Sequence, residues 1–275
     1  MRNLLSGIHA GAADVAKGII SMLELCAVSK QYSGIPVVQG VSFCARAGEV
    51  TGYLGPNGSG KSTTMKMITA LIEPTSGQIL FGGEPISREL MDFKQRMGYV
   101  PEEPHLYTHL SGSEYLLMVS QLRGLDGAEA RQRIEGLLRL FGLKDDRYAP
   151  ISAYSKGMRQ KVLLSAALMH NPDLLLLDEP FSGLDVGSAL VLRSLIQELA
   201  RRGKVVLFSS HELETVERVC EHVVILHRGR VVADDSIAGL RTLMALPSLE
   251  DIFSQLAVEQ DTEAISKEIA DLIHA

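Results

Sequence analysis

The sequence predicts an α/β fold that combines a mainly parallel sheet, a β-rich amino-terminal part and an inserted helical segment. An apolar strand runs directly into a glycine-rich loop and a helix in "TGYLGPNGSGKSTTMKMITALI", residues 51–72. Two further apolar runs, "PDLLLLDEP" and "GKVVLFSSH", flank the amphipathic helix "GSALVLRSLIQELARRG". The order strand, helix, strand is typical of a parallel sheet. Helical periodicity fills about residues 105–170, between these two patterns.

The amino-terminal strands come first along the chain. "MLELCAVSKQY", "VVQGVSFCARAGEV" and "EVTGYLG" are strand-like segments separated by turn residues, and "SGQILFGGEPI" predicts another hairpin that bends at Gly82 and Gly83. Residues 1–21 hold one early Arg and a weak apolar stretch broken by Gly and Asp14, a pattern that argues against a signal peptide. We expect a flexible or weakly helical extension there, and Met22 is an alternative start.

The helical segment opens with "SGSE", in which Ser111 and Glu114 have the spacing of a capping box. "AEARQRIEGLLRLFGL" continues it with apolar residues on one helical face. After the parallel strands, "HVVILHRGRVVADD" predicts a hairpin about Arg228 and Gly229. The expected organisation is therefore an extension over 1–21, one domain over 22–240 and an amphipathic helical tail over 241–275.

Composition and charge exclude several function classes. The 275 residues carry 27 Lys and Arg against 33 Asp and Glu, a net charge of −6, so the chain lacks the positive field that favours DNA or RNA. Three cysteines without CxxC spacing argue against a disulfide framework or a zinc site, and the eight histidines show no ligand spacing. No apolar stretch approaches the roughly eighteen residues of a spanning helix.

Residues 55–62, "GPNGSGKS", match the pattern G-x-x-x-x-G-K-[ST] between a predicted strand and a predicted helix. Glycines in such a loop let backbone N–H groups converge on phosphate oxygens, and the helix start adds partial positive charge. Lys61 is then expected to reach the β- and γ-phosphates, and Ser62 to hold Mg²⁺. The alternative is a chance glycine loop, which the flanking strand and helix argue against.

The run "LLLLDEP" predicts the second half of a phosphoryl-transfer site. A buried strand would present Asp178 at its end for Mg²⁺, and Glu179 beside it is the candidate general base for an attacking water. His211, after the strand "KVVLFSS", and the turn "SGLD" that ends at Asp185 fit a γ-phosphate sensor. Each of these two signals is weak alone. A histidine at a strand end is more often structural, and only the position of His211 after the two phosphate motifs favours a functional role.

In combination these motifs closely resemble the ATP-binding subunits of ABC transporters, from about Leu23 to Asp235. "LLLLDEP" resembles the family's Walker B motif, "SGLD" its D loop and "SSH" its H loop. The resemblance implies a P-loop NTPase (RecA-like) core, an antiparallel β subdomain and an inserted helical signature subdomain. It also implies an ATPase with ATP and Mg²⁺ as cofactors. "GPNGSGKST" resembles Walker A, so the implied ATP-binding residues are Gly55, Pro56, Asn57, Gly58, Ser59, Gly60, Lys61, Ser62 and Thr63.

The stretch "YSKGM", residues 154–158, occupies the position of the family's signature LSGGQ. Ser155 and Gly157 match, whereas Tyr154, Lys156 and Met158 depart from the pattern. The resemblance implies that Ser155 and Gly157 contact the γ-phosphate of ATP held by a second ATPase subunit, in a head-to-tail dimer. We expect Lys156 to face solvent rather than the transferred phosphate, because long lysine side chains extend outward.

Two further positions follow from the resemblance. Tyr32 in "SKQYSG" lies where the family places an aromatic residue that stacks on adenine. In "GYVPEEP", Glu102 lies where the family's Q loop usually has glutamine. Glutamate there adds negative charge beside the metal held by Asp178, so it either strengthens Mg²⁺ binding or slows hydrolysis.

The resemblance also implies the protein's partners and its cellular location. We expect a separate membrane permease that docks around Glu103 to Tyr107, and a peripheral position on the cytoplasmic face of the cell membrane. The tail "SLEDIFSQL" is similar to that of type-2 exporter subunits, which favours export over import. Two alternatives stay open: an ATP-dependent clamp for nucleic acid, disfavoured by charge and by the single motif set, and a subunit that binds ATP without hydrolysis.

Overall fold

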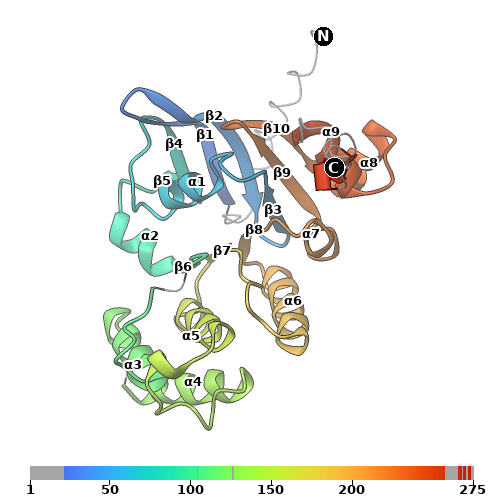
Figure 1. Cartoon of the computed structure of the whole chain (residues 1–275). Helices are drawn as coiled ribbons and strands as arrows, with labels where there is room; N and C mark the ends of the chain where they lie inside the picture. The colour runs from blue at the N-terminus through green and yellow to red at the C-terminus, as the bar shows by residue number, and fades with distance from the viewer. Residues whose placement is uncertain are drawn as a thin grey trace.

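The structure, a computed structural model, describes residues 22–103, 105–125 and 127–257, together with the pairs 266–267, 269–270 and 272–273. The expected extension over residues 1–21 lies outside the described residues, as does most of the expected helix after residue 257. Figure 1 shows a β-rich upper part and a helical lower part.

A small antiparallel sheet forms the amino-terminal part. Its strands are β1 (Met22–Tyr32), β2 (Ile35–Arg46), β4 (Ser76–Phe81) and β5 (Glu84–Pro85), in the order β2-β1-β4-β5. All neighbouring strands in it are antiparallel. The predicted bend between β4 and β5 is confirmed, since its two glycines have left-handed φ angles of 61° and 80°.

The larger sheet has the order β10-β9-β3-β8-β7-β6, and its strands from β9 to β6 are mutually parallel. β10 pairs with β9 in an antiparallel hairpin whose turn uses Arg228 at φ 47° and Gly229 at φ 77°, as predicted. β6 was not predicted, because four residues of "MGYV" carry too little periodicity. The strands are β3 (Val50–Leu54), β6 (Met97–Val100), β7 (Leu174–Asp178), β8 (Val205–Ser209), β9 (His222–His227) and β10 (Arg230–Ser236).

Two cores cover the two faces of the larger sheet. Leu174 and Leu176 of β7 face the core shared with the small sheet and α1, whereas Leu175 and Leu177 face the opposite core. Alternate side chains of a strand point to opposite faces, so burial on both faces requires the continuous apolar run "LLLL". The helices of these two layers are α1 (Lys61–Ile68), α2 (Leu90–Arg96), α6 (Val186–Arg201), α7 (Leu213–Val219), α8 (Ile237–Met244) and α9 (Leu249–Ala257).

The inserted helical part packs around a third core, which includes Leu116, Ile134 and Val162. It contains α3 (Gly112–Leu122), α4 (Gly127–Leu140), the 3₁₀ turn η1 (Ile151–Ala153) and α5 (Lys156–Leu168). The capping box at the start of α3 is confirmed, because the Ser111 backbone N–H donates to Glu114 Oε2 at 2.8 Å and the Glu114 N–H donates to Ser111 Oγ at 3.2 Å. The predicted α/β class is confirmed as well.

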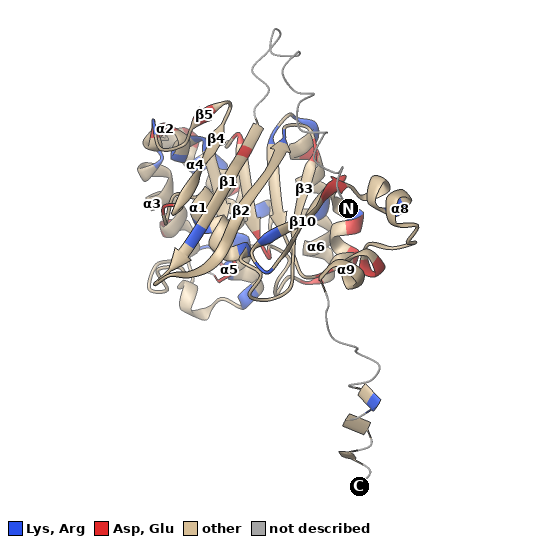
Figure 2. Cartoon of the chain, turned by 90° about the horizontal axis from the view of Figure 1, so that it is seen from above, with Lys and Arg blue, Asp and Glu red and all other residues tan. Residues whose placement is uncertain are grey.

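The surface mixes charges of both signs. Seen from above, Lys and Arg are interspersed with Asp and Glu among uncharged residues (Figure 2). None of the helices in the described part of the chain combines the length and the apolar character that crossing a bilayer requires.

Candidate nucleotide-binding site

The glycine-rich loop joins β3 to α1 and turns with a backbone that only glycine adopts easily. Gly58 and Gly60 have φ angles of 77° and 108°. At Gly55 a Cβ atom would collide with the carbonyl oxygen of Leu226 on β9. The loop is anchored from behind, since the Gly229 N–H donates to the carbonyl oxygen of Ser59 at 2.9 Å. The sequence motif therefore forms the tight turn expected of a phosphate-binding loop.

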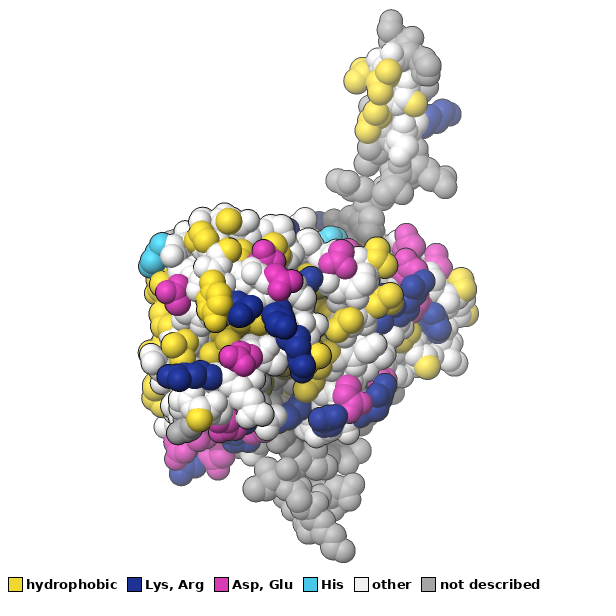
Figure 3. Space-filling model, turned by 90° about the horizontal axis from the view of Figure 1, so that it is seen from below, with side chains coloured by type: hydrophobic (Ala, Val, Ile, Leu, Met, Phe, Trp, Pro, Cys, Tyr) yellow, Lys and Arg dark blue, Asp and Glu magenta, His cyan; other side chains and the backbone are white. Residues whose placement is uncertain are grey.

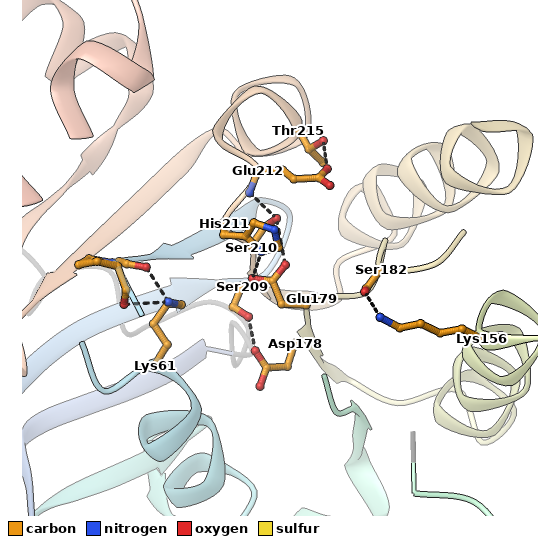
Figure 4. Close-up of polar contacts among 12 residues, drawn as sticks. Lys61, Lys156, Asp178, Glu179, Ser182, Ser209, Ser210, His211, Glu212 and Thr215 are labelled. Atoms are coloured by element: carbon orange, nitrogen blue, oxygen red, sulfur yellow. Dashed lines mark hydrogen bonds and ion pairs between the residues drawn. The ribbon is translucent and has the colours of Figure 1, made fainter. Parts of the chain in front are cut away.

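Lys61, the first residue of α1, folds back over this loop (Figure 4). Its Nζ atom donates to the carbonyl oxygens of Gly55 at 2.6 Å and Pro56 at 3.3 Å. Burial lowers the pKa of Lys61, although the carboxylates of Glu179 and Asp178 oppose that shift. A bound phosphate group would offer charged oxygen acceptors to the Lys61 ammonium group in place of these two carbonyl oxygens.

Asp178 ends β7 and is buried, with 4% of its surface exposed. Ser209 at the end of the parallel neighbour β8 donates a hydrogen bond from Oγ to Asp178 Oδ1. Burial raises the pKa of Asp178, and the charge of Glu102 adds to the increase. A buried carboxylate beside a second negative charge favours a bound cation.

Glu179 follows Asp178 with a left-handed backbone at φ 49°, unusual for a residue that is not glycine. Its N–H donates to the carbonyl oxygen of Ser209 at 3.1 Å, and its side chain points toward His211 (Figure 4). Glu179 Oε1 lies 2.9 Å from His211 Nδ1, and Ser210 Oγ donates to Oε2 at 3.4 Å. Burial raises the pKa of Glu179, whereas the hydrogen bond from His211 lowers it.

A cleft of about 350 Å³ brings most of the predicted residues together. Of the residues around it, Val37 of β2 was not predicted, and no feature of its strand distinguishes it from other partly exposed apolar residues. Its lining residues are Val37, Asn57, Gly58, Gly60, Lys61, Ser62, Thr63, Glu102, Asp178, Glu179 and His211. Gly55, Pro56 and Ser59 shape the loop without lining the cleft.

Tyr32 does not line this cleft. It ends β1, is 46% exposed, and has Lys30 Nζ 5.4 Å from its ring centroid. The ring is therefore accessible, but the structure leaves its role in base stacking a prediction.

Ser155, Gly157 and Asp185 also lie away from the cleft. Ser155 caps α5, and its Oγ accepts a hydrogen bond from the Met158 N–H at 3.2 Å. Asp185 caps α6, where it accepts from the Ser188 N–H at 2.9 Å. None of these three residues lines the cleft of its own chain.

The described residues contain no group of three or more His, Cys, Asp or Glu placed to hold a metal ion unaided. Ser62, Glu102 and Asp178 nevertheless line one cleft with oxygen donors. Mg²⁺ is commonly bound through one or two carboxylates together with substrate phosphates. The residues present fit a magnesium ion that arrives with a nucleotide rather than a permanent metal site.

Comparison with known proteins identifies the family. A family model described as "ABC transporter" matches residues 38–182. The chain is 40% identical over 224 residues to the ABC transporter ATP-binding protein NatA of Bacillus subtilis (strain 168), an alignment covering 80% of this chain and 91% of that protein. It is 36% identical over 253 residues to the linearmycin resistance ATP-binding protein LnrL of the same organism, covering 92% and 80% respectively.

A third relative, the Nod factor export ATP-binding protein I of Burkholderia orbicola (strain AU 1054), is 35% identical over 78% of this chain and 71% of its own length. Among solved structures, an ATP-binding subunit of an ABC transporter superimposes with a TM-score of 0.81 at 36% identity, over 86% of this chain and 99% of that one. Matching sequences, a matching fold and a P-loop cleft agree. The chain belongs to the ABC transporter family, as one of its ATP-binding, ATP-hydrolysing subunits.

Proposed function

We propose that the cleft holds the phosphates of ATP and that Glu179 activates the water that hydrolyses it. One observation carries this: Lys61 at the start of α1 and Glu179 after β7 line the same cleft as His211. Water would bond to the γ-phosphorus and pass a proton to Glu179 Oε2 or Oε1, while the bond from the γ-phosphorus to the ADP oxygen breaks. His211 would orient the γ-phosphate and hold the carboxylate.

The loop from Gly55 to Thr63 would bind the phosphates through backbone N–H groups and the start of α1. Ser62, Asp178 and Glu102 would hold Mg²⁺, which supplies charge neutralisation for the β- and γ-phosphate oxygens. Tyr32, which is exposed at the end of β1, would stack on adenine. Glu102 brings one more negative charge to this cleft than the glutamine usual in the family.

The active form is proposed to be a head-to-tail dimer with two ATP molecules at its interface. Ser155, Gly157 and Asp185 lie outside the cleft of their own chain, yet the start of α5 presents a capped N-terminus suited to an anion. Each chain would thereby complete the site of the other. We propose the domain division 22–240 with a helical subdomain over about 105–170, and a tail over 241–275.

The transport role would be export through a separate membrane permease. Support comes from the relatives, one named for linearmycin resistance and one for Nod factor export. The helical end exposes hydrophobic side chains among charged ones (Figure 3), and Tyr107, Leu122 and Leu140 of this part are 58%, 79% and 72% exposed. Docking there would hold the subunit on the cytoplasmic face of the membrane.

The test is ATP binding and phosphate release by the purified full chain with Mg²⁺. Lys61→Ala should lose ATP binding, whereas Glu179→Gln should bind ATP and release phosphate at least about 100-fold more slowly. Lys144→Ala, an exposed lysine of the helical part, serves as the control and should match the unchanged chain. Hydrolysis by Glu179→Gln at the normal rate would refute the assignment of the base. Co-purification from solubilised membranes would identify the permease.

A further inference from the structure

Lys156, the first residue of α5, contacts a segment far from it in the sequence. Its Nζ atom donates a hydrogen bond to Ser182 Oγ at 2.6 Å (Figure 4). Ser182 lies in the loop that follows Glu179, so the contact joins the helical part to the end of the catalytic strand β7. The expectation that Lys156 faces solvent was right about its exposure but missed this partner.

The stem of Lys156 also packs closely against this loop. Gly183 has a φ angle of 77°, and a Cβ atom there would lie 2.9 Å from Lys156 Cγ and 3.0 Å from Cδ. On the other side, a Cβ at Gly157 would lie 2.5 Å from the carbonyl oxygen of Gly183. A Cβ at position 157 would meet backbone, and one at position 183 would crowd the Lys156 stem on a left-handed backbone, so glycine suits both positions.

Two neighbouring side chains of α5 reinforce the contact. The buried Gln160 Nε2 donates to the carbonyl oxygen of Pro180 at 3.2 Å, and Lys161 Nζ lies 3.5 Å from Asp185 Oδ2. Residues four positions apart on a helix lie on one face, so Lys156 and Gln160 meet the loop side by side. The loop 180–185 thus contacts α5 through Pro180 at its start, Ser182 in its middle and Asp185 at its end.

We propose that Lys156 is a positioning residue that holds the start of α5, and Ser155 with it, against the loop 180–185 that follows Glu179. Through this contact the proposed signature segment and the base-bearing strand end of one chain would move as one unit. The inference rests on the proposed function of Glu179 and Ser155. The competing interpretation is that the Lys156 ammonium group contacts the phosphate of an ATP molecule directly.

Steady-state kinetics separate these two interpretations. Lys156→Met keeps the stem and removes the charge, and Ser182→Ala removes the acceptor. If the contact positions the segments, each variant should lower kcat for ATP hydrolysis about 3- to 10-fold with KM for ATP changed less than about twofold. The double variant should be no worse than the more impaired single variant, because both changes break one interaction.

Two further variants complete the set. Lys156→Arg, which keeps a donor, should retain at least about half of the activity, and Lys144→Met should behave as the unchanged chain. The proposal would be overturned, in favour of direct phosphate contact, if Lys156→Met lowered kcat and Ser182→Ala did not. Effects that multiply in the double variant would overturn it in the same way.

Hydrogen exchange without nucleotide tests the contact independently of catalysis. Amides of 157–161 and 181–185 should exchange faster in both Lys156→Met and Ser182→Ala, while α4 is unchanged. Faster exchange in a chain that does not hydrolyse ATP would uphold the contact and refute the proposed function. Unchanged exchange in both segments would overturn the contact itself.

Discussion

His211 Nδ1 lies 2.9 Å from Glu179 Oε1, although the two residues follow different strands, β8 and β7. The two side chains differ sharply in exposure: 12% for Glu179 and 70% for His211. Because β7 and β8 are parallel neighbours, their carboxyl ends lie side by side. The sheet therefore brings together two residues that are far apart in the sequence. The largely covered Glu179 carboxylate is thus paired with a histidine that remains exposed.

The first prediction concerns this pair. His211→Ala should lower kcat for ATP hydrolysis about 10- to 100-fold, because the carboxylate loses its orienting partner. ATP binding, measured with a fluorescent analogue, should change little, since the Lys61 loop is untouched. A binding loss equal to the kinetic loss would instead assign His211 to nucleotide binding alone.

The second prediction is a trade between stability and activity at Asp178. Burial and the Glu102 charge raise the pKa of Asp178 above its value in the unfolded chain. As the pH rises above that unfolded-chain pKa, the unfolded chain ionises more readily than the folded one, so the folded state loses stability. Asp178→Asn should raise the thermal midpoint at pH 7 without Mg²⁺ while ATP hydrolysis is lost.

Asp173 provides a control of opposite sign. Burial alone would raise the pKa of Asp173, but Arg96 at 2.9 Å and Lys204 at 3.4 Å lower it overall. Asp173→Asn should therefore lower the thermal midpoint at pH 7. A lower midpoint for both variants would contradict the stated cost at Asp178.

The third prediction compares two helical glycines. Gly157→Ala would place a Cβ atom 2.5 Å from the carbonyl oxygen of Gly183 and should cost about 1–3 kcal/mol of unfolding free energy. A Cβ atom added at Gly136 of α4 would meet nothing within 4 Å, so Gly136→Ala should gain about 0.5–1 kcal/mol. Urea titration of both variants measures the difference, and equal stabilities would argue against the close approach of α5 to the loop.

The fourth prediction is a pH dependence at His170, where α5 meets β6. Its Nε2 atom contacts the carbonyl oxygen of Met97 at 3.1 Å, and burial, with the charges of Arg123 and Arg133, lowers its pKa to about 4. The unfolded chain binds a proton near pH 6.5 and the folded chain does not, so His170 costs stability as pH falls from 6.5 to about 4.

His170→Gln keeps a donor for Met97 and removes this titration. Between pH 7.5 and pH 5 the unchanged chain should lose about 1–2 kcal/mol more unfolding free energy than the variant. Parallel losses in the two proteins would show that His170 does not carry the acid sensitivity.

Local patterns were enough to predict the glycine loop, the apolar strand before Asp178 and the hairpin at Arg228. Each of these depends on residues adjacent in the sequence, such as turn glycines or a continuous apolar run. The position of Val37 beside the loop depends on how the small sheet packs on the larger one. The bond from Lys156 to Ser182 joins residues 26 positions apart, which no local periodicity reports.

The proposed sandwich of ATP between two copies of the chain can be decided by light scattering on Glu179→Gln with and without ATP and Mg²⁺. Blocked hydrolysis should trap the closed form, so the mass is expected to double with ATP. Ser155→Arg in the same background should prevent the doubling, while Ser152→Arg, an exposed position in η1, should not. A monomer throughout, despite measured ATP binding, would contradict a homodimer and require a different ATPase chain or the permease for closure.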